Sequence, residues 1–212
     1  MIIIGAKGFA SQILQIFTEL NMLNQLMFFD NVSKDLPNRL YGQFYIIRSF
    51  EELKRAISTD PRYVLGVGDS LTRFMFREKI DAMGGIVQQA ISSSAVISSF
   101  NATIEAGVAV LTHVIIECGA YISEGALINN TAVISHDAHI GKYCIISPGA
   151  KVLGRVSIGD FSEIGSNAVI LPSRHVGEYC KIGAGAVVTR DVPDGTTAVG
   201  IPAKPLKFEE RN

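Results

Sequence analysis

Ile or Val occupies every sixth position of the sequence from Ile104 to Val188. All fifteen positions of this series are β-branched, and the residue four places after each is usually small, with Arg174 as the one large exception. A helix repeats about every 3.6 residues and a strand every two, so neither keeps a six-residue pattern in phase. An uninterrupted hexapeptide repeat is typical of a parallel β-helix and predicts that fold for the second half of the chain.

Three hexapeptides are expected to form one triangular coil, with each Ile or Val side chain pointing into the prism. Fifteen hexapeptides make five coils, and a stack at the strand spacing of about 4.8 Å is ~24 Å tall. A coil of eighteen residues also provides a ruler, because residue n lies beneath residue n+18. The ruler places outward side chains relative to one another from their numbers alone.

The first ninety or so residues have another rhythm, in which short apolar runs alternate with amphipathic segments. Strands are expected at 1–4, 26–30, 43–47, 63–69 and 86–91, and helices at 9–22, 50–57 and 71–83. This alternation predicts βαβ units and a small, Rossmann-like parallel sheet. We therefore expect two domains, an α/β domain over 1–91 and a β-helix with a C-terminal tail over 92–212.

Three loops at the carboxyl ends of the expected strands would line one crevice. GAKG at 5–8 lies between a strand and a helix, as phosphate-binding turns do in doubly wound folds. Lys7 replaces the middle glycine of G-x-G-x-x-G, so a plain tight turn is an equal alternative. Asp30 ends the second strand, where an acidic residue often meets a ribose, and Gly68 ends the fourth. Together the three loops favour a nucleotide-like ligand.

Composition narrows the choice of partners and compartment. The net charge is -1 and Lys and Arg form no basic run, so charge gives no argument for nucleic acid or an anionic membrane as partner. Three cysteines without a close pair do not indicate disulfides or a CxxC zinc site. The apolar run at 1–4 is too short for a signal peptide or a membrane span. We expect a soluble protein of the cytoplasm.

The stretch AVISHDAHIGKYC at 132–144 contains the residues that most suggest chemistry. By the ruler, His136 lies over Cys118 and under Gly154, a residue that would leave space beside the ring. Asp137 follows it and can increase the basicity of the imidazole, and Asn129 lies on the preceding strand. These features describe a general base beside a slot for a slim ligand. The alternative is a solvated surface histidine.

The other histidines give weaker signals. His139 shares a column with His175, two coils higher, which favours an exposed ladder. His113, His136 and His139 leave a three-histidine metal enzyme open as an alternative, but the rings of His136 and His139 are expected to point in different directions, and we expect no metal. Cys144 and Cys180 occupy small-residue positions of the repeat and are expected to be packing residues.

The chain as a whole resembles the hexapeptide-repeat sugar-nucleotide acetyltransferases, which include the bacillosamine-pathway and perosamine N-acetyltransferases and the sialic acid O-acetyltransferase-like proteins. The resemblance covers nearly the full length. The segments that carry it are IIIGAKGFASQIL, FFDN at 28–31, GVGDSLTR at 66–73, SHDAHIG at 135–141, ISPGAKVLGRVSIG at 146–159, IGAGAVVTRDVPDG at 182–195 and GIPAKPL at 200–206.

The resemblance implies a left-handed β-helix and acetyl-CoA-dependent N-acetylation of a nucleotide-linked amino sugar. It implies a homotrimer with acetyl-CoA in the groove between adjacent prisms. His136 would be the general base, Asp137 would increase its basicity, and Asn129 would help to build the site. Gly154, Ser166 and Ala184 would hold the coenzyme arm through backbone groups, with Lys204 near the adenine. The nucleotide would bind Lys7, Gly8, Phe9, Asp30, Asn31 and Gly68.

Two positions depart from the pattern of some family members, which carry histidine where this sequence has Phe9 and Ile145. Phe9 puts the identity of the nucleotide in doubt, and Ile145 can offer the coenzyme only an apolar contact. O-acetylation of a sialic acid-like or other hydroxyl acceptor would use the same residues and stays an alternative. A non-catalytic hexapeptide-repeat protein that keeps a nucleotide pocket is the other.

Overall fold

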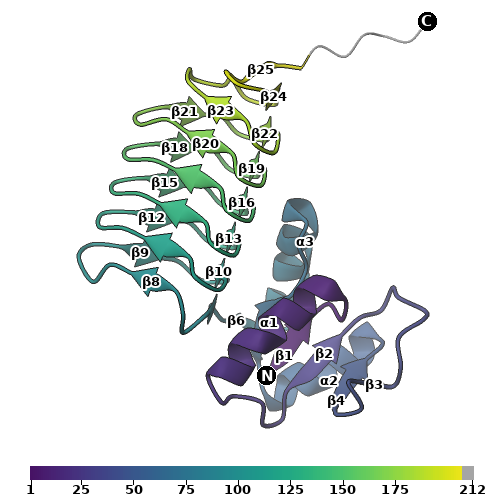
Figure 1. The fold of residues 1–212 in the computed structure, drawn as a ribbon. Helices are drawn as coiled ribbons and strands as arrows, with labels where there is room; N and C mark the ends of the chain where they lie inside the picture. The colour runs from purple at the N-terminus through teal and green to yellow at the C-terminus, as the bar shows by residue number, and fades with distance from the viewer. Residues whose placement is uncertain (207–212) are drawn as a thin grey trace, which may run out of the picture.

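The computed structural model describes residues 1–206, which form an α/β domain beside a tall β-helix (Figure 1). The N-terminal sheet has six strands in the order β3-β4-β2-β1-β5-β6. Its strands are β1 (Ile2–Ile4), β2 (Met27–Phe29), β3 (Arg39–Leu40), β4 (Phe44–Ile47), β5 (Arg62–Leu65) and β6 (Ile86–Val87). All pair in parallel except β3, which runs antiparallel to β4 and was not predicted.

Three helices connect the parallel strands: α1 (Gly8–Glu19), α2 (Phe50–Thr59) and α3 (Ser70–Asp81). The central strands are apolar on both faces because the helices cover both sides, and Ile2, Ile3 and Ile4 are completely buried. The predicted Rossmann-like alternation is confirmed. In chain order the parallel strands lie 3-2-1-4-5, so the order reverses at β1 and β5, where doubly wound folds bind ligands.

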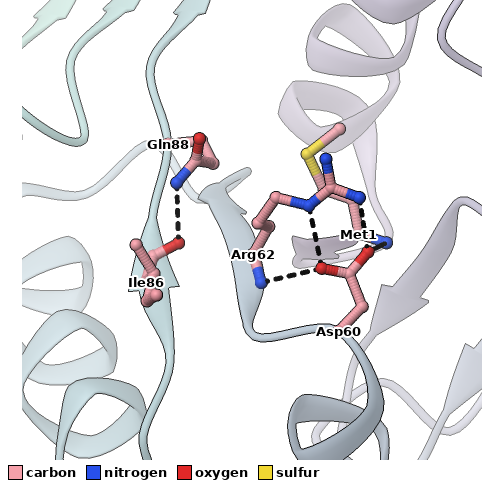
Figure 2. A network of polar contacts seen from close by, with 5 residues as sticks. All are labelled: Met1, Asp60, Arg62, Ile86 and Gln88. Atoms are coloured by element: carbon pink, nitrogen blue, oxygen red, sulfur yellow. Dashed lines mark hydrogen bonds and ion pairs between the residues drawn. The ribbon is translucent and has the colours of Figure 1, made fainter.

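Figure 2 shows how polar contacts tie the amino edge of this sheet together. The Asp60 carboxylate accepts hydrogen bonds from the N-terminal ammonium of Met1 at 2.8 Å and from Arg62 Nε at 2.9 Å and Nη2 at 2.8 Å. The Gln88 amide donates to the Ile86 carbonyl at 3.2 Å, beyond the end of α3. The starts of β1 and β5 are thus held side by side, at the edge opposite the three loops.

The β-helix has three sheets, which we call its first, second and third faces; all their strands pair in parallel except β25, which runs antiparallel to β24. The first face contains β7 (Ala90–Ile91), β10 (Ala109–Val110), β13 (Leu127–Ile128), β16 (Ile145–Ile146), β19 (Glu163–Ile164), β22 (Lys181–Ile182), β24 (Thr197–Val199) and β25 (Lys204–Pro205). The second face contains β8 (Val96–Ile97), β11 (Ile115–Ile116), β14 (Val133–Ile134), β17 (Lys151–Val152), β20 (Val169–Ile170) and β23 (Val187–Val188). The third face contains β9 (Thr103–Ile104), β12 (Tyr121–Ile122), β15 (His139–Ile140), β18 (Ser157–Ile158) and β21 (His175–Val176).

The hexapeptide ruler holds through most of this stack. Ile128, Ile146 and Ile164 are paired one above another at eighteen-residue steps and are buried, as are the small residues of the repeat. From Gly107 to Gly185, each corner contains a residue with positive φ just before the small-residue position of the repeat, and Asp137 is one of these, with φ of 57°. The step differs only at the ends: Val96 pairs with Ile115 and Lys181 with Thr197. The predicted β-helix of about five coils is confirmed.

The two parts of the molecule share one hydrophobic cluster. Outward residues of the first face, among them Ala109, Leu127 and Ile145, pack into the cluster that contains α1 residues Ile13 and Phe17. Figure 1 shows α1 and α3 on the side of the α/β domain that meets the β-helix.

The expected single strand over 86–91 is wrong at this junction. β6 extends the N-terminal sheet, whereas β7 pairs with β10 and belongs by its hydrogen bonds to the β-helix. Gln88 and Gln89 separate the two strands. No helix among residues 1–206 combines the length and the apolar character needed to cross a membrane.

Candidate active site

His136 and Asp137 lie at the corner where the chain leaves β14 of the second face. His136 Nδ1 is 2.9 Å from Asp137 Oδ2, and the two side chains are 44% and 62% exposed. An ionised carboxylate can only accept, so the hydrogen of a neutral imidazole resides on Nδ1. The lone pair is then on Nε2, at the far end of the ring, where it can take a proton from a ligand.

Two glycines make room for this pair. A Cβ added at Gly154 would lie 2.7 Å from His136 Cε1 and closer still to Nε2, so the ring uses the space that the missing side chain leaves. One coil below, a Cβ at Gly119 would overlap Asp137 Oδ1. The structure thus places Gly154 against the reactive edge of the ring, at the position given by the eighteen-residue ruler.

Asn129 lies at a different corner of the same coil. It follows β13 on the first face, is partly buried, and donates its backbone N–H to the Ile146 carbonyl at 2.8 Å. Its side chain makes no hydrogen bond to any other residue within 1–206. Within one chain, Asn129 and His136 therefore flank opposite edges of the second face and are not brought together.

The residues expected at the coenzyme also flank the second face. Gly154 lies on the His136 edge, whereas Ser166 and Ala184 are stacked one coil apart on the Asn129 edge. The backbone N–H groups of these three residues have no acceptor within the part of the chain that the structure describes, so each is free to donate. Lys204 is exposed on β25, which folds back antiparallel to β24 at the top of the stack.

The α/β domain has a cleft of about 260 Å³ at the carboxyl edge of its sheet, and the predicted Lys7, Phe9, Asp30 and Gly68 are among the residues that line it. Gly8 and Asn31 lie beside the cleft and do not line it. Lys7 is the N-cap of α1 and makes no side-chain capping hydrogen bond, and the first N–H groups of the helix, beside the cleft, have no acceptor among residues 1–206. Such a helix start attracts an anion.

The Asp30 carboxylate is already held in place by its own loop. Oδ1 accepts from the N–H groups of Val32 at 3.0 Å and Ser33 at 2.8 Å, and Oδ2 accepts from the Ser33 hydroxyl at 3.0 Å. Burial disfavours ionisation of Asp30, but these hydrogen bonds more than offset it and lower the pKa of the carboxyl. Asp30 therefore presents a fixed, ionised acceptor to the cleft.

A larger cavity of about 700 Å³ lies elsewhere on the same domain. Its lining comes from the segment before β2 and from the β3–β4 hairpin, including Gln25, Met27, Arg39 and Tyr45. These residues lie at the amino edge of the sheet or on its outermost strands, β3 and β4. The smaller cleft lies at the reversal of strand order and adjoins an uncapped helix start, so it is the better candidate for a nucleotide.

His139 belongs to a different surface. It points outward from the third face and stacks on Tyr121, with ring centroids 5.1 Å apart, and is in register with Ser157 and His175. The expected exposed ladder is therefore present, and His139 does not join His136. Among residues 1–206, no three His, Cys, Asp or Glu side chains are grouped so that they could hold a metal ion.

Comparisons with known proteins agree with this architecture. The model of the bacterial transferase hexapeptide (six repeats) matches residues 119–154 and 155–190. A search of curated proteins gives no significant match. The acetyltransferase domain of PglB from Neisseria gonorrhoeae FA1090 is 30% identical over 97% of this chain and 98% of that chain, with a TM-score of 0.88. The chain belongs to the hexapeptide-repeat sugar-nucleotide acetyltransferase family.

Further structures extend this comparison. A variant of perosamine N-acetyltransferase from Caulobacter crescentus, in complex with CoA and GDP-perosamine, is 28% identical, with 98% of this chain and 96% of that chain covered and a TM-score of 0.90. WeeI from Acinetobacter baumannii AYE, at 24% identity and a TM-score of 0.82, shares the fold. The acetyltransferase described here is accordingly an acyltransferase whose β-helix is left-handed.

The structure of this acetyltransferase also shows two residues at the site that the sequence analysis missed. Glu117 Oε2 accepts the backbone N–H of His136 at 2.9 Å and so fixes the corner that carries the base. Glu105 accepts the backbone N–H of Glu124 in the same way, again across nineteen residues. A carboxylate nineteen residues before His136, which is one coil plus one residue, was therefore the sequence signal for Glu117. The second missed residue is Arg73, whose side chain is completely buried.

Proposed function

We propose that this acetyltransferase transfers an acetyl group from acetyl-CoA to the amine of a nucleotide-linked amino sugar, with His136 as general base. The observation that carries the proposal is the free Nε2 of a histidine that is oriented by Asp137 and left accessible by Gly154. The names of the relatives support both substrates, because one was solved with acetyl coenzyme A and another with CoA and GDP-perosamine.

The chemistry is a direct transfer. The acceptor amine attacks the thioester carbonyl, His136 Nε2 takes a proton from the nitrogen, and the CoA thiolate leaves. Asp137 keeps the hydrogen on Nδ1 and stabilises the imidazolium that forms. The N–H of Gly154, which has no acceptor within residues 1–206, would donate to the developing oxyanion, an interaction often worth about 3 kcal/mol.

A trimer would complete the site. The first face is covered by the α/β domain, and the third carries polar groups such as His139 and His175. The outward residues of the second face are Val or Ile except Lys151, and its Val96 and Ile115 are 65% and 41% exposed. Packing of second faces around a threefold axis would bring the His136 edge of one chain to the edge of its neighbour that contains Asn129, Ser166 and Ala184.

The carboxyl-edge cleft would hold the nucleotide in this proposal. The uncapped start of α1 and Lys7 would bind the diphosphate, and the fixed carboxylate of Asp30 would accept from ribose or base. Phe9 would supply an apolar wall, since its ring lies against Gly68, with 3.9 Å between the ring and an added Cβ.

A substrate panel tests the proposal. UDP-, dTDP- and GDP-linked 4-amino sugars, each with its 4-hydroxy counterpart, are incubated with acetyl-CoA, and free CoA thiol is measured. We expect release with an amino member and little with its hydroxy partner. Preference for the hydroxy sugars would replace N-acetylation by O-acetylation. Release with no member, together with no thermal protection by CoA, would favour a non-catalytic protein.

A further inference from the structure

Arg73 makes an unusual set of contacts at the junction of the two domains. Its side chain is fully buried on α3, and all five of its N–H groups donate to backbone carbonyls. A guanidinium has five donors in a fixed fork, so the fork is saturated. No acidic side chain within residues 1–206 forms an ion pair with Arg73.

Two of the acceptors belong to the nucleotide side. Arg73 Nη1 donates to the carbonyl of Leu65 at 3.0 Å and to that of Val67 at 2.9 Å. Leu65 ends β5, and Val67 is in the loop 66–69, which lines the carboxyl-edge cleft. These bonds fix the floor of the cleft to the guanidinium.

The other three acceptors belong to the β-helix. Nε donates to the Gly125 carbonyl at 2.9 Å, and Nη2 donates to Gly107 at 3.2 Å and Ala126 at 3.5 Å. Gly107 and Gly125 lie at equivalent corners of successive coils, and both have positive φ. Ala126 begins the coil that runs through Asn129 to His136.

This arrangement is costly for stability alone. A buried charge without a carboxylate partner carries a desolvation penalty. Burial lowers the pKa of Arg73 to about 10, so the side chain keeps its charge at neutral pH. Lysine has three donors and no planar fork, so it cannot satisfy five carbonyls in two domains at once.

We infer that Arg73 is a positioning residue for acyl transfer: it fixes the nucleotide cleft of the α/β domain at a set place relative to the β-helix that carries His136. This inference rests on the proposed function. A substrate that spans both parts needs them in register, and a displacement of about 1 Å can reduce the rate by on the order of 100-fold.

The test compares Arg73→Lys and Arg73→Met with Arg62→Lys, a control at the opposite edge of the sheet. Each variant is assayed with a nucleotide-linked amino sugar and with the same sugar without its nucleotide, which does not use the cleft. We expect kcat/KM for the nucleotide-linked sugar to fall on the order of 100-fold in both Arg73 variants. The value for the free sugar and the KM for acetyl-CoA should change less than about threefold. Arg62→Lys should behave as wild type.

Equal losses with both acceptors would overturn the inference, because they would indicate general damage to the fold. Wild-type values for both acceptors would overturn it too. Should Arg73→Met fail to fold, Arg73→Lys decides by the same criteria.

Hydrogen exchange provides a second readout that needs no substrate. The amides of 65–69 and 123–126 should exchange faster in the Arg73 variants, while β1 and β17 stay protected. If the wild type releases no CoA with any sugar nucleotide, the proposed function fails. Hydrogen exchange alone then tests whether Arg73 holds the two domains together. Unchanged exchange in both segments would overturn the role of Arg73.

Discussion

The β-helix and the α/β domain place their functional groups in different ways. In the β-helix, inward positions repeat every six residues, and the corners, which differ from one coil to the next, carry His136, Asp137 and Gly154. In the α/β domain the polar groups lie in loops at strand ends, which are not spaced by a fixed repeat. In a repeat fold the functional residues can be recognised where they depart from the repeat, whereas in a doubly wound fold the site is recognised from the point where the strand order reverses.

The difference between inward and outward positions can be tested within the single strand β15. Ile140 is completely buried, and its neighbour His139 is exposed. Ile140→Ala should lower the free energy of unfolding by about 2–5 kcal/mol, because it leaves a cavity in a stacked core. His139→Ala loses only its stacking on Tyr121, about 1 kcal/mol. Chemical denaturation measures both, and equal values would contradict the assignment of inward and outward sides.

Removal of the base tests whether the corner, and not the strand, carries the chemistry. His136→Ala should reduce turnover at least ~100-fold, because it removes the group that takes the proton in the proposed transfer. Acetyl-CoA binding, followed by thermal protection, should survive. His139→Ala is the matched control, since it removes the other histidine of the same stretch and should keep near-normal turnover. Near-normal turnover in His136→Ala would refute the general base.

The two glycines beside the pair allow a finer test. Gly154 has no positive φ, so Gly154→Ala should leave stability almost unchanged while the new Cβ displaces the ring and reduces turnover on the order of 10-fold. Gly119 has φ of 70° and its added Cβ would meet Asp137, so Gly119→Ala should reduce both turnover and Tm. Steady-state kinetics and thermal melting separate the two. A stability loss in Gly154→Ala as large as in Gly119→Ala would contradict this reasoning.

Sequence alone predicted the β-helix closely because one rule fixes every coil. The eighteen-residue step placed Gly154 above His136 and put His139 and His175 in one column, and the structure shows both. The α/β domain was predicted as an alternation of elements, without β3 and with β6 and β7 joined. Two-residue strands on either side of Gln88 and Gln89 give no periodic signal that could separate them.

Arg73 could not be predicted for a different reason. In SLTRFMFREKID it resembles the other charged residues of an amphipathic helix, such as Arg77 and Lys79. Its burial depends on how α3 docks against the corners at Gly107 and Gly125, which is a property of the pair of domains. Glu117 differs from Arg73, because its nineteen-residue spacing to His136 is the same as the spacing from Glu105 to Glu124, and this repeated spacing is visible in the sequence.

The smallest expected effect compares the two edges of the N-terminal sheet through Asp60 and Asp30. The hydrogen bond from Arg62 and the N-terminal ammonium lower the pKa of Asp60 below its usual range. A lowered pKa in the folded state stabilises the fold above the unfolded value of about 3.9, and this contribution is lost as the pH falls below it. Asp60→Asn should therefore cost roughly 1 kcal/mol at pH 7, about the same at pH 5, and less as the pH falls below about 3.9.

Substitutions at the two edges of the N-terminal sheet should also differ in their effect on enzyme activity. Asp60 is at the amino edge, so Asp60→Asn should keep the KM for the nucleotide-linked sugar, whereas Asp30→Asn at the cleft should raise it by about 10-fold through loss of a charged acceptor. Both aspartates have a lowered pKa from local hydrogen bonds, so a difference in KM reflects position and not ionisation. An equal KM in the two variants would remove Asp30 from the nucleotide site and leave the binding to the start of α1.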